Sequence, residues 1–547
     1  MNLINDKWLP YRLKDGTEKT LPIRAICHPE VIDFALPRAD FQGAAYQFAI
    51  GLLQTVFAPE DELEWHEYYE QPPTENDLDN AFSKVAHAFN IDGEGPLFMQ
   101  DFDTLETASE KNISQILIET PGENAVKENK DHFIKRSHCN VMSLEMAALS
   151  LFTLQLNAPP NKACKPGRVG LRGAGPLTTL VMPSNVNDSL WTKLWLNVIN
   201  ADYLRYEVPD FHDGSIFPWL VKTSSIAEDG GAIYQNDVHP LHMFWAMPSR
   251  IRLNVHKGEQ ICGITGLKTS VFVDMFKILG NGNNYDGEWS HTLTPYRYNK
   301  KGDLFLSAKG SSDSGQYKYW CDYSFIDTES KVTCAAVVSH FYSVLPFFLK
   351  KNKQLPNLWV FAYDLDQAKL KNWYSHYFPI FNLNKDLADE LVRKIKQLAN
   401  LSDELSKKVL ECIKLVSYGR FDSKTSQLEF GKKNPAQKSD NTISENIKSD
   451  FWLRSESLFY ISVSQLIENA SQESSILTPT QAKEWLTSIR SLCIDLFDEF
   501  ALSELGNQKS MSKRIKARQQ LTGWLFGSKE IKAFIVNHNI EFTKEVA

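Results

Sequence analysis

The sequence predicts an α+β protein in which a large, irregular mixed N-terminal domain, residues 1–378, precedes an all-α four-helix bundle, residues 379–547. Two patterns carry this prediction. Between about Leu180 and Gln367, short runs of β-type residues alternate with clusters of Gly, Asn and Pro, which is typical of strands joined by turns. From about Leu383 onward, apolar residues recur at the spacing of helices that bury one face.

Two helices are expected ahead of the strand-rich stretch. The first begins at Asp40, whose carboxylate can cap the first free backbone amides, and ends before Pro59. The second begins at Ser143 and is closed by Pro159 and Pro160.

The remaining elements follow from short local patterns. Strands are expected at residues 251–255 and 358–363, where β-branched and aromatic residues dominate. The bundle rests on four helical patterns, at residues 387–416, 451–470, 480–505 and 512–526. A polar insert, residues 421–449, interrupts them and is expected to be a mobile loop.

Composition excludes several classes of protein. With 43% hydrophobic and 23% charged residues, the 547-residue chain can bury a core, so wholesale disorder is excluded. A net charge of −8 and a pI of about 6.0 exclude a generic basic nucleic-acid coat protein but leave room for a local contact. The eight cysteines form no Cys-x-x-Cys pair, and the chain has neither a secretory signal nor an apolar run that could span a membrane. We therefore expect a soluble, cytoplasmic protein with no membrane partner.

A glycine-rich segment is the first candidate site. Residues 167–175 contain four glycines, which can bring bare backbone close to a partner, while Arg168 and Arg172 could contact phosphates. The segment is neither a Rossmann fingerprint nor a P-loop. Two alternatives stay open: a purely structural turn, and a phosphate site in a nucleotide- or nucleic-acid-processing enzyme.

Two basic segments are further candidates. In the loop at residues 121–140, Phe133 and Lys135 combine a stacking ring with a cation, as single-stranded nucleic-acid sites do; a solvated charged loop is the alternative. Near the C-terminus, Lys513, Arg514 and Arg518 could hold phosphates from a helix surface; an ordinary solvated bundle face is the alternative.

Metal and catalytic motifs are weak. His132, His138 and Cys139 lie close in the sequence but lack a second ligand pair, so we expect no metal. No spacing marks a nucleophile or a catalytic carboxylate pair. From the residues alone, a binding protein, an enzyme and a pure scaffold all remain possible.

The order of several motifs resembles one known family, the large CasA subunit of the type I-E Cascade CRISPR surveillance complex. The matching segments are residues 1–12, 36–59, 96–100, 165–181, 244–253, 288–297 and 361–374. The resemblance implies a non-catalytic DNA-binding subunit without a cofactor. Its N-terminal domain would recognise the protospacer-adjacent motif of duplex target DNA from the minor groove, and it would start strand separation for R-loop formation.

The resemblance also implies partners and a division of labour. The partners would be guide RNA, the backbone, small and RNA-end-binding subunits, and a helicase-nuclease recruited to the target. Guide pairing would read most of the sequence, as in another RNA-guided effector. The minor groove offers a degenerate code, so its reader is expected to be tolerant.

Individual residues carry over by position. Gly167 is our first choice for the glycine loop, and Lys277 for a lysine finger, with Lys268 as its rival. Gln367 matches a glutamine wedge, with Asp366 beside it. The resemblance places Phe133 and Lys135 at the guide-RNA end or a neighbouring subunit. Zinc does not carry over, because only Cys262 remains where some members have several cysteines.

Overall fold

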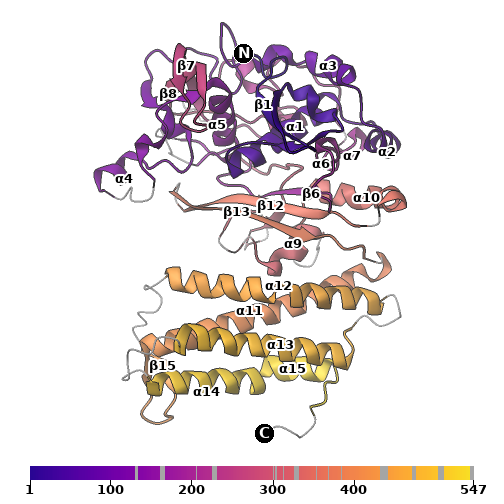
Figure 1. Ribbon diagram of the computed structural model, residues 1–547, viewed down its shortest axis with the longest axis vertical. Coiled ribbons are helices and arrows are strands. Elements are labelled where there is room, and N and C mark those ends of the chain that lie inside the picture. Colours follow the sequence, from indigo (N-terminus) through magenta and orange to yellow (C-terminus); the bar gives the residue numbers. More distant parts are fainter. Residues whose placement is uncertain are drawn as a thin grey trace. The chain divides into compact units, whose positions relative to one another are not determined.

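A computed structural model gives the fold of this chain (Figure 1). It describes residues 1–129, 134–159, 167–204, 206–223, 231–299, 301, 305–311, 313, 315–325, 332–352, 354–366, 369–383, 385–431, 441–470, 476–502 and 511–542. The chain forms two compact units, one comprising Met1–Gly315 with Asp322–Ile380 and the other Gln316–Cys321 with Phe381–Ala547. The first is mixed and the second is helical, which confirms the predicted α+β class.

Small antiparallel sheets form the mixed unit. Their strands are β1 (Leu9–Leu13), β2 (Glu18–Leu21) and β3 (Val31–Phe34); β4 (Ser109–Asn112), β5 (Met142–Ser143), β7 (Arg250–Ile261) and β8 (Lys268–Leu279); β6 (Thr178–Met182), β12 (Asn357–Asp366) and β13 (Lys369–Pro379); and β9 (Tyr296–Tyr298), β10 (Phe305–Ser307) and β11 (Val332–Thr333). The strands expected at residues 251–255 and 358–363 are confirmed within β7 and β12.

The mixed unit also contains helices. They are α1 (Ala39–Val56), α2 (Glu62–Glu70), α3 (Glu75–Ser83), α4 (Glu123–Lys127), α5 (Leu144–Asn157), α6 (Leu190–Trp195), α7 (Ala201–Leu204) and α10 (Ala336–Lys351), while α9 (Trp320–Ser324) begins in the short segment that belongs to the helical unit. The sequence pattern did not predict α10, because its apolar residues lie among β-type runs.

Both expected N-terminal helices are confirmed, but only one is capped as expected. Ser143 caps α5, since its hydroxyl accepts a hydrogen bond from the Met146 amide. Asp40 lies inside the first turn of α1, where its carboxylate binds Arg38 instead of a backbone amide. The expectation that Asp40 is the N-cap was therefore wrong.

An aromatic cluster forms the centre of the mixed unit. The ring of Phe48, on α1, meets five rings edge to face at centroid distances of 5.6 to 5.9 Å: Trp8, Phe89, Phe98, Phe152 and Trp245. Edge-to-face contacts add to the free energy gained by burying the rings. Because Phe152 lies on α5, the cluster joins the two long N-terminal helices.

Long helices lying side by side form the second unit (Figure 1). They are α11 (Ala388–Tyr418), α12 (Asn441–Ala470), α13 (Pro479–Phe497) and α14 (Met511–Gly527), followed by the shorter α15 (Lys529–Asn537). The polar insert differs from expectation, because β14 (Gly419–Phe421) pairs with β15 (Leu428–Phe430) and α12 begins at Asn441. None of the described helices is both long and apolar enough to cross a membrane.

The six-residue segment Gln316–Cys321 is part of the helical unit although it lies far upstream in the sequence. Tyr317 stacks on Phe459 of α12 at 4.2 Å between ring centroids, and its hydroxyl lies 3.0 Å from the Ser455 hydroxyl. Trp320 meets Phe381 edge to face at 5.4 Å. These buried rings make the segment a component of the bundle core.

Replacing Tyr317 with Ala should destabilise the helical unit by about 3–5 kcal/mol, the usual cost of removing a buried aromatic side chain. Tyr317→Phe keeps the ring and loses only the hydroxyl, so it should cost about 1 kcal/mol. Hydrogen exchange of α11 and α12 would measure both losses. Equal losses for the two variants would contradict the assigned role of the ring.

Candidate nucleic-acid interface

The end of the glycine-rich segment lies against the β12–β13 hairpin. Gly175 has a φ of +56°, and a Cβ at this position would lie 2.9 Å from the carbonyl oxygen of Tyr363 on β12. The amide of Gly310 donates to the carbonyl of Gly175 at 3.0 Å, and Gly310 also bridges to Asp364. The end of the glycine segment at Gly175 therefore lies against β12 at Tyr363, three residues before Asp366.

The hairpin end carries the predicted wedge position. Asp366 and Lys369 are cross-strand partners, and Asp366 is exposed with its carboxylate 3.4 Å from the Lys371 ammonium. Gln367 follows Asp366 in the sequence and lies outside the described residues. What the structure shows of this site is thus the paired, exposed frame on either side of Gln367.

Internal hydrogen bonds define the shape of the glycine segment. The Gly173 amide donates to the Gly170 carbonyl at 2.7 Å, and the Gly175 amide donates to the Asn157 carbonyl at 2.9 Å. Two amides are therefore already engaged and do not point freely at an anion. Gly167, our first choice for the loop, is half-buried at the described start of the segment.

The two arginines of the segment differ in their surroundings. Arg172 is only 4% exposed, and its guanidinium donates to Gln47 at 2.9 Å and to Thr294 at 3.1 Å. The prediction that Arg172 contacts phosphate is corrected, because the side chain braces the segment from inside; burial lowers its pKa to about 10. Arg168 is half-buried, and its Nε finds no hydrogen-bond partner among the described residues.

Lys309 also contacts this segment, and the sequence analysis did not identify it. Its ammonium donates to the Arg172 carbonyl and, at 2.8 Å, to the Ser307 hydroxyl. A Cβ at Gly173 would collide with the same ammonium. A lysine more than a hundred residues from the glycines gives no local sequence signal for this contact.

The two lysine-finger candidates lie on β8 in different settings. Lys277 is half-buried in mid-strand, with Glu110 of β4 as its partner on one side and Arg252 of β7 on the other. Lys268 is exposed at the first residue of β8, opposite Ile261, where the β7–β8 hairpin turns. An extended finger needs a free tip, and Lys268 has the more open position.

An ion network holds the segment at residues 134–140. Arg38 forms hydrogen bonds with both Asp40 and Glu119, and His138 lies 3.6 Å from Glu119. Burial would raise the pKa of Glu119, but the contact with His138 and the hydrogen bonds from Arg38 outweigh this effect and hold the pKa at about 2. Lys135 is exposed beside this network, and Phe133 lies outside the described residues.

Tyr363 connects this network to the hairpin. Its hydroxyl donates to Asp40, and its backbone carbonyl faces Gly175 and Gly310. Burial and the neighbouring Asp40 raise the Tyr363 pKa well above its ordinary value, so the hydroxyl stays a donor. Sequence analysis missed Arg38, Glu119 and Tyr363, since only the fold brings these distant positions together.

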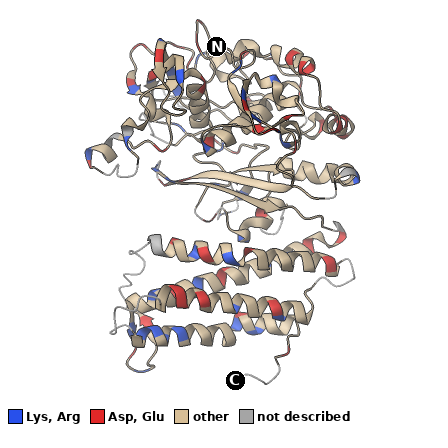
Figure 2. Ribbon diagram, in the orientation of Figure 1, with Lys and Arg blue, Asp and Glu red and all other residues tan. Residues whose placement is uncertain are grey.

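Lys and Arg positions occur along α14 (Figure 2), but the basic face there is smaller than predicted, because one arginine is buried and another is paired. Arg514 is 6% exposed, so the prediction that it contacts nucleic acid is corrected: it points into the bundle. Arg518 is engaged by Asp498, at 2.7 Å and 2.8 Å. Lys513 is half-exposed and stays a candidate.

No group of three potential ligands from His, Cys, Asp and Glu forms a metal site within the described ranges. His132 lies outside those ranges. His138 is occupied by Glu119 and by the Lys135 carbonyl, and Cys139 and Cys262 are buried free cysteines. The described residues therefore offer no donor set that fits zinc.

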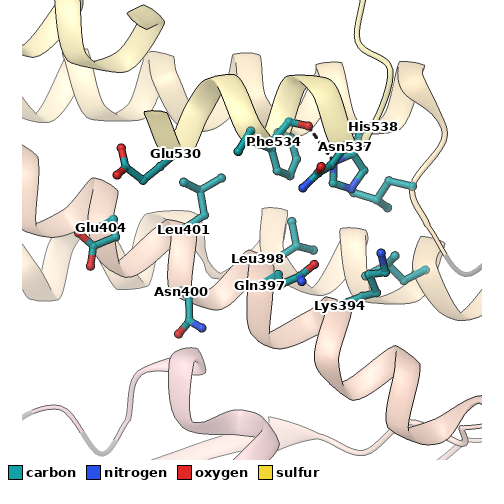
Figure 3. A pocket seen from close by; sticks show the side chains of 13 residues that line it. Lys394, Gln397, Leu398, Asn400, Leu401, Glu404, Glu530, Phe534, Asn537 and His538 are labelled. Carbon is teal, nitrogen blue, oxygen red and sulfur yellow. Dashed lines mark hydrogen bonds between the residues drawn. The ribbon is translucent and has the colours of Figure 1, made fainter. Parts of the chain in front are cut away.

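A separate groove of about 300 Å³ lies in the helical unit, between α11 and α15 (Figure 3). Apolar residues, among them Leu398, Leu401 and Phe534, line it. Glu404 and Glu530 lie at one end and Lys394 at the other. This lining suits an apolar side chain rather than a phosphate.

Comparison with known proteins gives consistent matches. The family model of CRISPR-associated protein Cse1 matches residues 2–496. The fold is similar to that of CasA from Thermus thermophilus, with a TM-score of 0.66, 16% identity and coverage of 96% of this chain and 99% of that chain. Cse1 from Acidimicrobium ferrooxidans matches with a TM-score of 0.64 and 13% identity, over 98% of this chain and 99% of that chain. A chain of a CRISPR RNA-guided surveillance complex matches with a TM-score of 0.62 and 14% identity, over 95% of this chain and 99% of that chain.

Replacing Gly175 with Ala should lower the free energy of unfolding of the mixed unit by about 1–3 kcal/mol. The positive φ disfavours an L residue, and the new Cβ would press on the Tyr363 carbonyl. Gly122→Ala is the matched control, because nothing lies within 4 Å of a Cβ there. Urea unfolding would compare them, and similar stabilities would show that the close approach is unimportant.

Proposed function

The chain belongs to the family of CRISPR-associated protein Cse1, and we propose that it acts as the DNA-recognising large subunit of a type I-E CRISPR surveillance complex. The observation that carries the proposal is the meeting of the glycine segment with the β12–β13 hairpin at Gly175 and Tyr363. Gly170 and Gly175 are buried, so the part of the segment that can approach the minor groove is its half-buried start at Gly167, while the exposed hairpin end enters the base stack. One similar solved chain is described as part of a CRISPR RNA-guided surveillance complex.

The proposed roles follow from position. The strip from Gly167 faces the minor groove and reads the protospacer-adjacent motif, while Gln367, with Asp366 beside it, wedges the first base pair apart. Unstacking costs a few kcal/mol per step, so protein contacts and guide pairing must offset it. Two engaged glycine amides favour this role over a phosphate cradle in a nucleotide-processing enzyme. The proposed activity is binding without catalysis.

Other candidates complete the proposal. Phe133 and Lys135 contact the guide-RNA end or a neighbouring subunit, Arg168 approaches a DNA phosphate, and Lys513 contacts flanking DNA. The protein works with double-stranded target DNA, guide RNA, the other complex subunits and the helicase-nuclease that it recruits. A net charge of −8 is compatible with this, because basic partners in the complex can hold the DNA.

Gln367→Ala should slow R-loop formation on linear target DNA by about tenfold or more, since a wedge worth about 1.4 kcal/mol changes a rate tenfold. Negative supercoiling helps to open DNA, so the loss should be smaller on a supercoiled template. The assay uses the assembled complex and a target that matches the guide. Its flanking motif is first chosen by selection from targets with randomised flanking sequences. Gln71→Ala, at an exposed glutamine outside the site, is the control. Unchanged rates on both templates would exclude the wedge.

Binding of the assembled complex to duplex DNA can separate the roles of Lys268 and Lys277. We expect Lys268→Ala to weaken binding to the duplex about tenfold and to reduce discrimination between flanking motifs, because its exposed ammonium can reach the groove. Lys277→Ala should change neither by more than about twofold, since Lys277 lies half-buried in mid-strand. The reverse result would assign the finger to Lys277.

A further inference from the structure

A continuous chain of polar contacts runs from the 134–140 segment to the hairpin. His138 Nε2 lies 3.6 Å from Glu119, and Glu119 accepts from Arg38 at 2.5 Å and 3.0 Å. Arg38 also donates to Asp40 at 3.0 Å and 2.7 Å, and Asp40 accepts from the Tyr363 hydroxyl. These five side chains come from four separate stretches of the sequence.

We propose that Arg38 and Glu119 are positioning residues for strand separation, which tie the duplex-opening β12–β13 hairpin to the 134–140 segment. This inference rests on the proposed function, because it assigns to the network the task of aiming that hairpin. Seating of the 134–140 segment on guide RNA or a neighbouring subunit then sets the position of the element that opens the duplex.

The geometry makes Arg38 hard to replace. Its planar guanidinium binds two carboxylates at once, and those carboxylates are mostly buried, with Asp40 7% and Glu119 11% exposed. A lysine ammonium is a single point of charge and cannot form two bidentate pairs. Without the guanidinium, two buried carboxylates would lose their shared cation, which the fold can relieve only by protonating or moving one of them.

Tyr363 links the position of Asp40 to the position of the hairpin. It lies three residues before Asp366 on β12, and its backbone carbonyl packs against Gly175 and Gly310. A displacement of Asp40 would therefore act through the tyrosine ring on both proposed DNA-contacting elements. Since the ring is 2% exposed, it cannot absorb such a displacement by moving into solvent.

His138 offers a way to read the network independently. Its Nε2 faces Glu119, its Nδ1 contacts the Lys135 carbonyl, and Arg38 lies nearby. The interaction with Glu119 raises the pKa of His138. A raised folded-state pKa means that the His138 contact is strongest below about pH 6.5 and is lost as pH rises through the folded value. Glu119 stays ionised throughout, because its pKa is held at about 2.

The central test is Glu119→Gln in the assembled complex with the full chain. We expect R-loop formation on linear target DNA to slow at least fivefold, with a smaller effect on supercoiled DNA. In the parent, the rate should fall as pH rises from 6 to 8.5. That pH dependence should disappear in Glu119→Gln and in His138→Gln. Arg38→Lys, which keeps the positive charge but not the guanidinium, should form R-loops more slowly than the parent.

A matched control lies in the same unit. Glu75 also lies between an arginine and a histidine, 2.9 Å from Arg24 and 3.0 Å from His28, but far along the sequence from the hairpin and the 134–140 segment. Glu75→Gln should change thermal stability without changing the R-loop rate or its pH profile. Equal R-loop rates for Glu119→Gln, Glu75→Gln and the parent would overturn the positioning role.

Failure of this inference can be told apart from failure of the proposed function. If Gln367→Ala slows R-loop formation but the network variants do not, the hairpin acts without this tie. If Gln367→Ala also leaves the rates unchanged, the proposed function itself fails. If a network variant has the same melting temperature and the same R-loop rate as Glu75→Gln, the network has only a structural role. That result also rejects the inference.

Discussion

The hydrogen bond between the Tyr363 hydroxyl and Asp40 is the interaction on which the candidate interface depends. One end of the tyrosine is fixed by a carboxylate that Arg38 already holds, and its backbone lies against two glycines. Any side chain at Gly175 or Gly310 would push β12 away, since a Cβ there would lie 2.9 Å or 2.2 Å from the Tyr363 carbonyl. Gly175 and Gly310 therefore serve the close packing of β12.

Buried cations support this arrangement from inside. Arg172 lies in the interior with neutral oxygen partners, Gln47 and Thr294, and its own carbonyl accepts from the Lys309 ammonium. Keeping a guanidinium buried costs free energy unless its donors are satisfied. Arg172, which the sequence suggests as a DNA contact, therefore holds the glycine segment in shape instead.

Local sequence patterns predicted the helices and strands well, but they predicted poorly which charged side chains are buried. Helices α1 and α5 and the strands at residues 251–255 and 358–363 follow from spacing and turn residues, because those signals act over a few residues. Arg514 illustrates the limit: its spacing from Arg518 places both on one side of a helix, but only packing decides which part of that side turns inward. The contact of Arg38 with Glu119 joins residues 81 positions apart and that of Tyr363 with Asp40 residues 323 positions apart, so no local signal could reveal them.

The segment Gln316–Cys321 has a consequence for how this protein can be exchanged between genomes. Its rings complete a core whose helices begin only at Ala388, so the helical unit is not a contiguous stretch of the chain. A recombination event near residue 380 would combine the Tyr317 ring of one parent with the Phe459 partner of another. A crossover just upstream of residue 316 spares this core but separates β6 from β12 within the mixed unit, so neither position divides the chain cleanly between its two units.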